Sequence, residues 1–192
     1  MAEHAKGITR KRDFEMNENL KEWIKDVLFA VLFAFLILQF IMPTVVKESS
    51  MENTLIENDY LIVSKKAYKI FGDCERGDII VFQSRIPMGD GSNDTKLLVK
   101  RIIATGGDTI SISGGKVYIN GEEIKEDYLK DGTTNGEMAE TAIPEGYLFC
   151  MGDNRLVSRD SRDPSVGMVS VDSIKGKVVL RVFPAKKFGK IE

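Results

Sequence analysis

The chain has 192 residues, which is room for one domain of ordinary size in addition to an apolar N-terminal segment. Charged residues make up 29% of the sequence, hydrophobic residues make up 43%, and the formal net charge is −2. These values give no sign of a basic nucleic-acid surface or an acidic tail, so we expect no nucleic-acid partner and look to individual motifs for function.

An apolar run from Val27 to Met42 follows a polar segment at residues 1–22. Extended to residues 23–46, the run is long enough for a helix to cross about 30 Å of hydrocarbon. A cleavable signal peptide and a buried core helix are the alternative interpretations. No A-x-A-like cleavage site follows the run, and it is apolar on every face, so we expect a permanent transmembrane anchor.

Basic residues are concentrated before this run: Lys6, Arg10, Lys11, Arg12, Lys21 and Lys25. After the run, only Lys47 follows closely. The positive-inside rule then puts residues 1–22 in the cytoplasm and residues 47–192 outside it. We therefore expect a plasma-membrane protein that crosses the lipid bilayer once.

Residues 47–192 read mostly as short strands, rich in β-branched and aromatic residues and bounded by Gly, Asp, Asn or Pro. The expected strands cover residues 60–63, 78–82, 97–103, 109–112, 116–119, 147–151 and 177–183. Ser113-Gly-Gly115 and Asn120-Gly121 are turn signals that predict a meander over residues 108–125. The polar stretch at about residues 126–146 reads as a surface excursion. We predict a mainly β fold, with an antiparallel β catalytic domain after one transmembrane helix.

The chain has two cysteines, Cys74 and Cys150, and a single histidine, His4. The cysteines are far apart, without a C-x-x-C motif or a nearby histidine, so we expect no metal site. Buried free thiols are the favoured interpretation, and a disulfide is the alternative for an exported domain. His4 lies in the segment assigned to the cytoplasm, so an outward-facing domain cannot use it as a catalytic base.

Lys100 and Arg101 lie next to each other inside an apolar strand. Adjacent strand residues face opposite ways, so one of the two shares a face with Leu98 and Ile102. The pattern is compatible with a lysine that snorkels at a sheet edge and with a buried functional lysine. A lysine that acts as a base must be neutral, and burial lowers its pKa from about 10.4 in the required direction.

Two further polar segments have both a functional and a structural interpretation. Ser50 follows the apolar run, where a serine is usually part of a linker or a helix cap. Residues 152–162 could form a charged turn with Asx hydrogen bonds. Taken one at a time, these segments do not identify an enzyme.

Four segments occur in a fixed order along the chain: Ser50-Met-Glu-Asn-Thr-Leu55, Arg76-Gly-Asp-Ile-Ile-Val-Phe82, Lys100-Arg-Ile102 and Gly152-Asp-Asn-Arg-Leu-Val-Ser-Arg-Asp-Ser-Arg162. This order resembles that of the bacterial type I signal peptidases, which carry S-M-x-P-T-L, R-G-D-[IV]-[IV]-x-F, K-R-[VI] and G-D-N-R-x-x-S-x-D-S-R behind an N-terminal anchor. The resemblance covers about residues 20–183. The short chain and single anchor are similar to the form common in Gram-positive bacteria.

The resemblance implies a Ser-Lys dyad, in which Ser50 is the nucleophile and Lys100 the general base, and no cofactor or metal. Ser158 matches the serine that hydrogen-bonds the lysine and orients it. The charged residues of the last segment are expected to shape the site: Asp153, Arg155, Asp160 and Arg162. The residues that flank the dyad match substrate-pocket positions: Met51, Leu55 and Val99.

Two positions depart from the family pattern. Asn53 stands where the family usually has proline, so the turn after the nucleophile lacks a fixed φ. Glu48 occupies a position near the oxyanion hole where relatives carry Ser or Gly. A carboxylate directed into that site would oppose a developing negative charge, so we expect Glu48 to point outward and the Ser50 backbone N–H to be an oxyanion donor.

The expected partners are the signal peptides of exported preproteins, cut after small residues at the outer membrane surface and bound as an added strand. An autoprotease of the LexA-like repressor type would share the Ser-Lys core, but the anchor and the absence of a helix-turn-helix segment argue against it. A catalytically silent membrane-anchored β module is another alternative. Loss of Ser50 or Lys100 would be its expected mark, and both residues are present.

Overall fold

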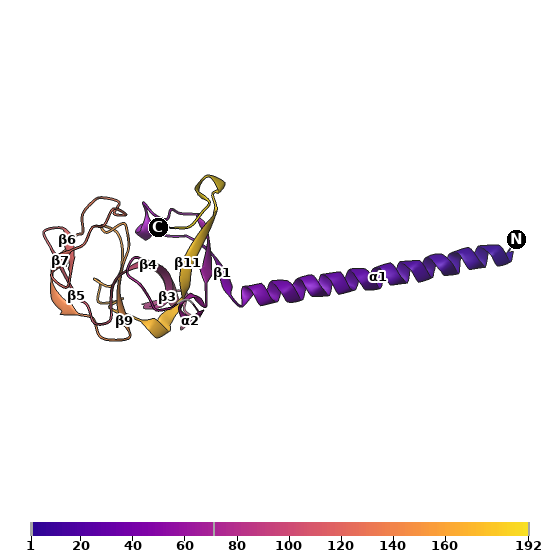
Figure 1. The fold of residues 1–192 in the computed structure, drawn as a ribbon, viewed down its shortest axis with the longest axis horizontal. Coiled ribbons are helices and arrows are strands. Elements are labelled where there is room, and N and C mark those ends of the chain that lie inside the picture. Colours follow the sequence, from indigo (N-terminus) through magenta and orange to yellow (C-terminus); the bar gives the residue numbers. More distant parts are fainter. Residues whose placement is uncertain (1, 71, 192) are drawn as a thin grey trace. The chain divides into compact units, whose positions relative to one another are not determined.

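The computed structural model describes residues 2–70 and 72–191, and the chain divides into two compact units, Met1–Phe40 and Ile41–Glu192. The first unit consists of one helix, α1, which runs from Ala2 to Leu38 (Figure 1). Its C-terminal half exposes large apolar side chains from Leu20 to Leu38. Residues 2–22 of the predicted polar segment therefore lie in the same helix as the first part of the apolar run.

The structure corrects the expected transmembrane helix over residues 23–46. Helix α1 ends at Leu38, and the last part of the apolar run forms a strand, β1, at Ile41–Val45. Charged residues up to Asp26 leave Val27–Leu38 as the uninterrupted apolar part of the helix, which is about 18 Å long at 1.5 Å per residue. Within the described residues, no helix combines the length and the apolarity needed to cross a membrane.

The second unit contains two sheets whose paired strands are all antiparallel, which confirms the mainly β prediction. The larger sheet has the order β1 (Ile41–Val45), β2 (Tyr60–Ser64), β11 (Ile174–Phe183), β3 (Ile79–Pro87), β4 (Thr95–Thr105), β9 (Tyr147–Met151) and β10 (Val169–Ser170). The smaller sheet has the order β7 (Glu122–Glu123), β6 (Lys116–Ile119), β5 (Thr109–Ser113) and β8 (Met138–Ala142).

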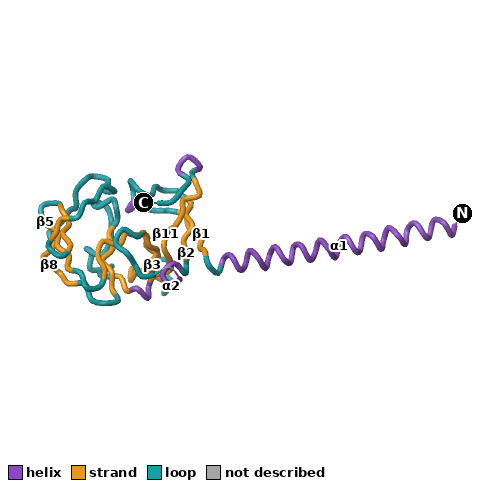
Figure 2. Tube along the Cα trace, in the orientation of Figure 1, coloured by secondary structure: helices purple, strands orange, loops and turns teal. Residues whose placement is uncertain are grey.

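Within this unit, the smaller sheet lies at one end and strands β1 and β11 lie at the other (Figures 1 and 2). Short helical segments complete the unit: η1 (Ser49–Met51), α2 (Ala67–Ile70), η2 (Val171–Ser173) and η3 (Ala185–Lys187). Much of the remaining chain is loop, drawn in teal in Figure 2. These loops carry most of the polar residues of the candidate site.

The predicted strands are found, and two of them, β6 and β9, have the predicted bounds. The predicted meander forms through the β5–β6 hairpin, in which Ser113 pairs with Lys116, and through the β6–β7 pair. The predicted excursion at residues 126–146 is only partly a loop, because Met138–Ala142 forms β8 against β5. Strand β1 was also not predicted.

The apolar residues of the second unit form a core that holds the segment between β1 and β2. Met51 and Leu55 in this segment are 1% and 0% exposed. They belong to a cluster with Val46, Leu61, Val63, Ile79, Val81 and Val178. Burying two large side chains a turn apart fixes the backbone between β1 and β2, which is where Ser50 lies.

Candidate active site

Ser50 lies in η1, in a short turn that enters the core. It is 9% exposed, between an exposed Ser49 and the buried Met51. The Leu55 backbone N–H donates to Met51 O at 2.7 Å, which closes the turn after the serine. Burial of Met51 and Leu55 thus holds the Ser50 hydroxyl in one place on the molecule.

Lys100 lies on β4, a strand with neighbours on both sides, and its side chain meets Ser50. Residue Lys100 pairs with Ile80 of β3 in the sheet, and it is 1% exposed. Its Nζ lies 2.5 Å from Ser50 Oγ. The structure therefore favours the buried lysine over the snorkelling lysine at a sheet edge.

The surroundings of Lys100 favour its neutral form. Burial lowers the pKa of the Lys100 amine from 10.5, while the carboxylates of Asp160, Glu48 and Asp153 act in the opposite direction. Lys100 forms no ion pair with any of the described residues, and Ser50 Oγ is its hydrogen-bond partner there. An amine that is desolvated in this way is able to accept a proton from a hydroxyl.

Arg101, the next residue on β4, is buried as well, at 3% exposed. Strand alternation sends its side chain to the opposite face from Lys100, where Asp153 accepts from Nε at 2.9 Å and from Nη2 at 2.8 Å. The guanidinium also lies 4.1 Å from the centre of the Tyr128 ring. A charge-assisted ion pair and an aromatic ring thus compensate the desolvation of Arg101. Lys100 is also buried, but it has no ionic partner among the described residues.

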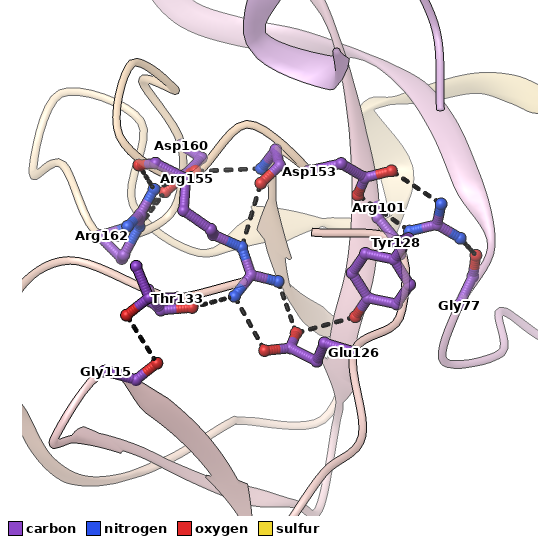
Figure 3. Close-up of polar contacts among 12 residues, drawn as sticks. Gly77, Arg101, Gly115, Glu126, Tyr128, Thr133, Asp153, Arg155, Asp160 and Arg162 are labelled. Carbon is purple, nitrogen blue, oxygen red and sulfur yellow. Dashed lines mark hydrogen bonds and ion pairs between the residues drawn. The ribbon is translucent and has the colours of Figure 1, made fainter. Parts of the chain in front are cut away.

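The segment after β9 forms a network of ion pairs, drawn in Figure 3. Arg155, 1% exposed, donates through Nε to Gly152 O at 3.0 Å and pairs with Glu126. Asp160, 0% exposed, accepts from Arg162 Nε and Nη2 at 2.8 Å each and from the Gly152 backbone N–H at 3.0 Å. These contacts fix the loop at both of its ends.

The structure differs from the expectation for Ser158. Its Oγ is buried and makes no hydrogen bond to the described residues, so it does not bond Lys100 in this conformation. The hydroxyl packs beside Gly152, where an added Cβ would collide with Ser158 Oγ and with Ser50 O. Ser158 therefore lies close to the turn at residues 49–55 that carries Ser50, which we name the nucleophile turn after the expected role of Ser50. The absence of a side chain at Gly152 makes that approach possible.

Asn154 was not singled out in the sequence, although it joins the two halves of the site. Its backbone N–H donates to Ser50 O at 3.1 Å, and its Nδ2 donates to Ser49 O at 3.1 Å. The residue is 3% exposed. Asn154 lies inside the Gly-Asp-Asn-Arg sequence, and its place in that motif is the signal in the sequence that indicates a role in the site.

Asn53 has an unusual backbone conformation, with φ 91°. Proline, with φ fixed near −65°, could not adopt it. The Asn53 Nδ2 donates to Tyr128 O at 3.1 Å and to Leu129 O at 3.5 Å. The turn that lacks the family's usual proline is therefore held by a side-chain contact to another segment of the chain.

Glu52 supports the same contact, because it pairs with Lys130. The segment that contains Glu126, Tyr128 and Lys130 is thus attached to the nucleophile turn and to the ion-pair network. The segment is polar and weakly patterned, so no motif in the sequence indicates this role. Its contacts identify it: Glu126 pairs with an arginine 29 positions away, Tyr128 O accepts from Asn53, and Lys130 pairs with Glu52.

A groove of about 610 Å³ leads to Ser50. It is lined by the three predicted pocket residues, Met51, Leu55 and Val99, among others. Its walls include residues 44–48, which contain the end of β1, and residues 94–99, which contain the start of β4. We expected Glu48 to point outward, away from the site. The residue is exposed, but it lines the same groove as Ser50, and its carboxylate raises the pKa of Lys100.

The cysteines take no part in the contacts of the dyad. Both are free thiols; Cys150 is buried and Cys74 is half-buried. Burial raises the pKa of the Cys74 thiol to about 11, which makes it a poor nucleophile at neutral pH. Burial also raises the pKa of the Cys150 thiol, so both thiols are poor nucleophiles at neutral pH.

Comparison with known proteins agrees with this geometry. Residues 20–183 match the family described as signal peptidase, peptidase S26. Signal peptidase I P of Bacillus subtilis subsp. natto is 34% identical over 187 residues, which cover 92% of this chain and 96% of the relative. Signal peptidase I of Bacillus caldolyticus is 38% identical over 157 residues, 75% of this chain and 80% of the relative.

A crystal structure of a signal peptidase I from Enterococcus faecalis is 30% identical, with a TM-score of 0.45, and covers 55% of this chain and 96% of that chain. The match to the family spans both residues of the dyad and the whole ion-pair network. The chain belongs to the signal peptidase family, peptidase S26.

Proposed function

We propose that this protein is a membrane-bound serine endopeptidase that removes signal peptides from exported preproteins with a Ser50-Lys100 dyad. The observation that carries the proposal is the 2.5 Å distance between Lys100 Nζ and Ser50 Oγ, in a site where burial lowers the pKa of the lysine. The family membership and the names of the relatives support the substrate class.

In the proposed reaction, neutral Lys100 accepts the Ser50 proton as Oγ attacks the scissile carbonyl. The protonated amine then gives its proton to the leaving amine, and an acyl-enzyme remains on Ser50. Water activated by the same lysine releases the signal peptide and restores the serine. The Ser50 backbone N–H is the proposed oxyanion donor, and Asn154 holds the adjacent carbonyl.

The groove supports recognition of an extended peptide. Its lining combines the apolar side chains of Met51, Leu55 and Val99 near the serine with backbone from the ends of two strands. We propose that the substrate lies along these strands and places small side chains next to the dyad. Large side chains at those positions would meet the buried Met51 and Leu55.

Membrane attachment is part of the proposal. Apolar side chains of α1 are exposed on successive turns, among them Phe29 at 70% and Leu28 at 68%. Exposed apolar surface of this kind is stable in a bilayer or a detergent and costly in water. We propose that the apolar part of α1 attaches the protein to the plasma membrane, with the β unit on its outer side.

Cleavage of a preprotein by the full chain in non-ionic detergent tests the chemistry. Ser50→Ala and Lys100→Ala should each abolish cutting while folding, followed by circular dichroism, is retained. Ser49→Ala, at the exposed neighbouring serine, and Lys175→Ala, at an exposed lysine of β11, are matched controls that should keep full activity. Undiminished activity of either dyad variant would refute the proposal.

Topology is tested separately. A protease added to intact cells should degrade the β unit, and the protein should sediment with membranes after a high-salt wash. Release of the full chain into the soluble fraction by salt would refute the apolar attachment, and protection of the β unit would refute the orientation.

A further inference from the structure

A second cavity, of about 440 Å³, adjoins the nucleophile turn. It shares no lining residue with the groove that leads to Ser50. Its lining is largely polar and basic: Asn53, Thr54, Asp127, Tyr128, Arg181, Lys187, Lys190 and Ile191. The proposed peptidase reaction uses none of the three basic residues in this cavity.

Arg181 on β11 is the buried element of this cavity, at 8% exposed. Its Nη2 donates to Thr54 O, and its Nε lies 3.0 Å from Asp59 Oδ2. That Nε is buried against Asp59, and no described contact uses Nη1. The guanidinium is therefore held in a fixed orientation and keeps donor capacity at Nη1.

Lys187 and Lys190 add two ammonium groups to the cavity lining. Among the described residues, neither lysine forms an ion pair or a side-chain hydrogen bond. The one acidic residue that lines the cavity, Asp127, is paired with Lys125 at 2.6 Å. The charge available to a ligand in this cavity is therefore positive.

We propose that this cavity is a binding site for a phosphate oxyanion, either inorganic phosphate or the phosphodiester head group of a phospholipid. The Nη1 of a guanidinium that is held in place donates to a phosphate oxygen, and the two lysines bind the same group as point charges. Donors from three side chains around one cavity match the several oxygens of a phosphate better than the two oxygens of a carboxylate.

The same contacts connect the cavity to the nucleophile turn. Arg181 donates to Thr54 O, and Thr54 Oγ1 bonds the carboxylate of Asp153, which in turn pairs with Arg101. An anion bound to Arg181 keeps the guanidinium against Thr54 O and so restricts the turn that carries Ser50. Occupancy of the cavity by an anion should therefore raise kcat. This effect on kcat rests on the proposed peptidase activity, whereas binding of the anion does not.

Binding is tested with the full chain in non-ionic detergent by titrating inorganic phosphate and following its 31P line width. The double variant Lys187→Gln with Lys190→Gln should weaken binding about tenfold, as expected for the loss of charge-assisted contacts. The double variant Arg85→Gln with Lys175→Gln removes the same charge at exposed positions away from the cavity lining, and should change affinity less than twofold. Equal weakening in the two double variants would overturn the proposal.

Vesicles identify the source of the phosphate. If the ligand is a lipid head group, vesicles containing phosphatidylglycerol should bind at a phosphate concentration at which inorganic phosphate does not. These vesicles should also bind more tightly than phosphatidylcholine vesicles, and the double variant Lys187→Gln with Lys190→Gln should bind both vesicle types equally. If it is free phosphate, both vesicle types should behave alike while inorganic phosphate binds. Binding of neither ligand to the unaltered chain would overturn the site, and binding without a change in kcat would overturn only its coupling to Ser50.

Discussion

The side-chain amide of Asn53 offers a direct measure of how the nucleophile turn is held. Asn53 combines a φ of 91° with a 3.1 Å hydrogen bond from Nδ2 to Tyr128 O. Asn53→Gly keeps that backbone conformation accessible and removes only the hydrogen bond. The substitution relieves backbone strain, which stabilises the folded state by about 1 kcal/mol. It also gives the unfolded chain more conformational entropy than asparagine does, which destabilises the folded state by about 0.5 to 1 kcal/mol, so the two effects nearly cancel. What remains is the lost hydrogen bond, about 1 kcal/mol of unfolding free energy.

Asn58→Gly is the matched control. Asn58 is also exposed and has φ 67°, but its side chain makes no hydrogen bond to a described residue. The same substitution there should leave the unfolding free energy within about 0.5 kcal/mol, because strain relief and entropy still cancel. The difference between the two variants, measured by urea denaturation, isolates the contact of Asn53 with Tyr128 O.

The same pair of variants tests positioning in a cleavage assay. With its turn released, Ser50 spends less time in line with Lys100, so Asn53→Gly should lower kcat about tenfold and change KM less than twofold. Asn58→Gly should leave both constants unchanged. Asn53→Pro cannot adopt φ 91° and should cost about 3 kcal/mol or more. An unchanged kcat in Asn53→Gly, or an equal loss in Asn58→Gly, would refute the reasoning.

Three further changes test the charges and the packing around the dyad. Glu48→Gln removes a carboxylate that raises the pKa of Lys100, so the rise of activity with pH should move to lower pH; a shift to higher pH would contradict this. Asp153→Asn leaves Arg101 buried without its ionic partner and should cost about 3 to 5 kcal/mol of unfolding free energy in urea. A loss below about 1 kcal/mol would show that the pair is not needed. Gly152→Ala places a methyl group against the Ser50 carbonyl and should reduce kcat about a hundredfold, whereas a fully active variant would mean that the turn can move.

The strands of the second unit were predictable where pattern and turn signals agreed. Strand β9 is a compact apolar segment between polar loops, and β6 lies between two glycine turns, so their bounds followed directly. Strand β8 has the sequence Met-Ala-Glu-Thr-Ala, which lacks alternation and has only one β-branched residue, so its pairing with β5 decides its conformation.

Strand β1 was missed for a different reason. Hydropathy alone does not separate the end of an apolar helix from the start of an apolar strand, and Ile41–Val45 continues the run that begins at Val27. Pro43 is the local signal against a continued helix, because proline removes a backbone donor and clashes with the preceding turn. Pairing with β2 then makes the segment an edge strand, where proline is tolerated.

The dyad could be named from the sequence only as a resemblance. Fifty positions separate Ser50 from Lys100, and no periodicity relates a turn after β1 to a residue inside β4. The structure supplies what the pattern could not, namely the 2.5 Å approach and the burial that selects the neutral amine. The partner of Arg155 was unpredictable for the same reason, because Glu126 lies in a segment without a recognisable pattern.

The buried basic side chains of the second unit differ in whether each has a carboxylate partner. Three of those described are arginines, and each has a carboxylate: Arg101 with Asp153, Arg155 with Glu126 and Arg181 with Asp59. A guanidinium stays protonated in a protein, so its burial requires such a partner. Lys100 is equally buried and has no carboxylate partner among the described residues, because an amine can leave the charged state instead. Each of these three arginines is paired and Lys100 is not, so the cost of desolvation falls on the one of the four groups that can become neutral, as its proposed role as base requires.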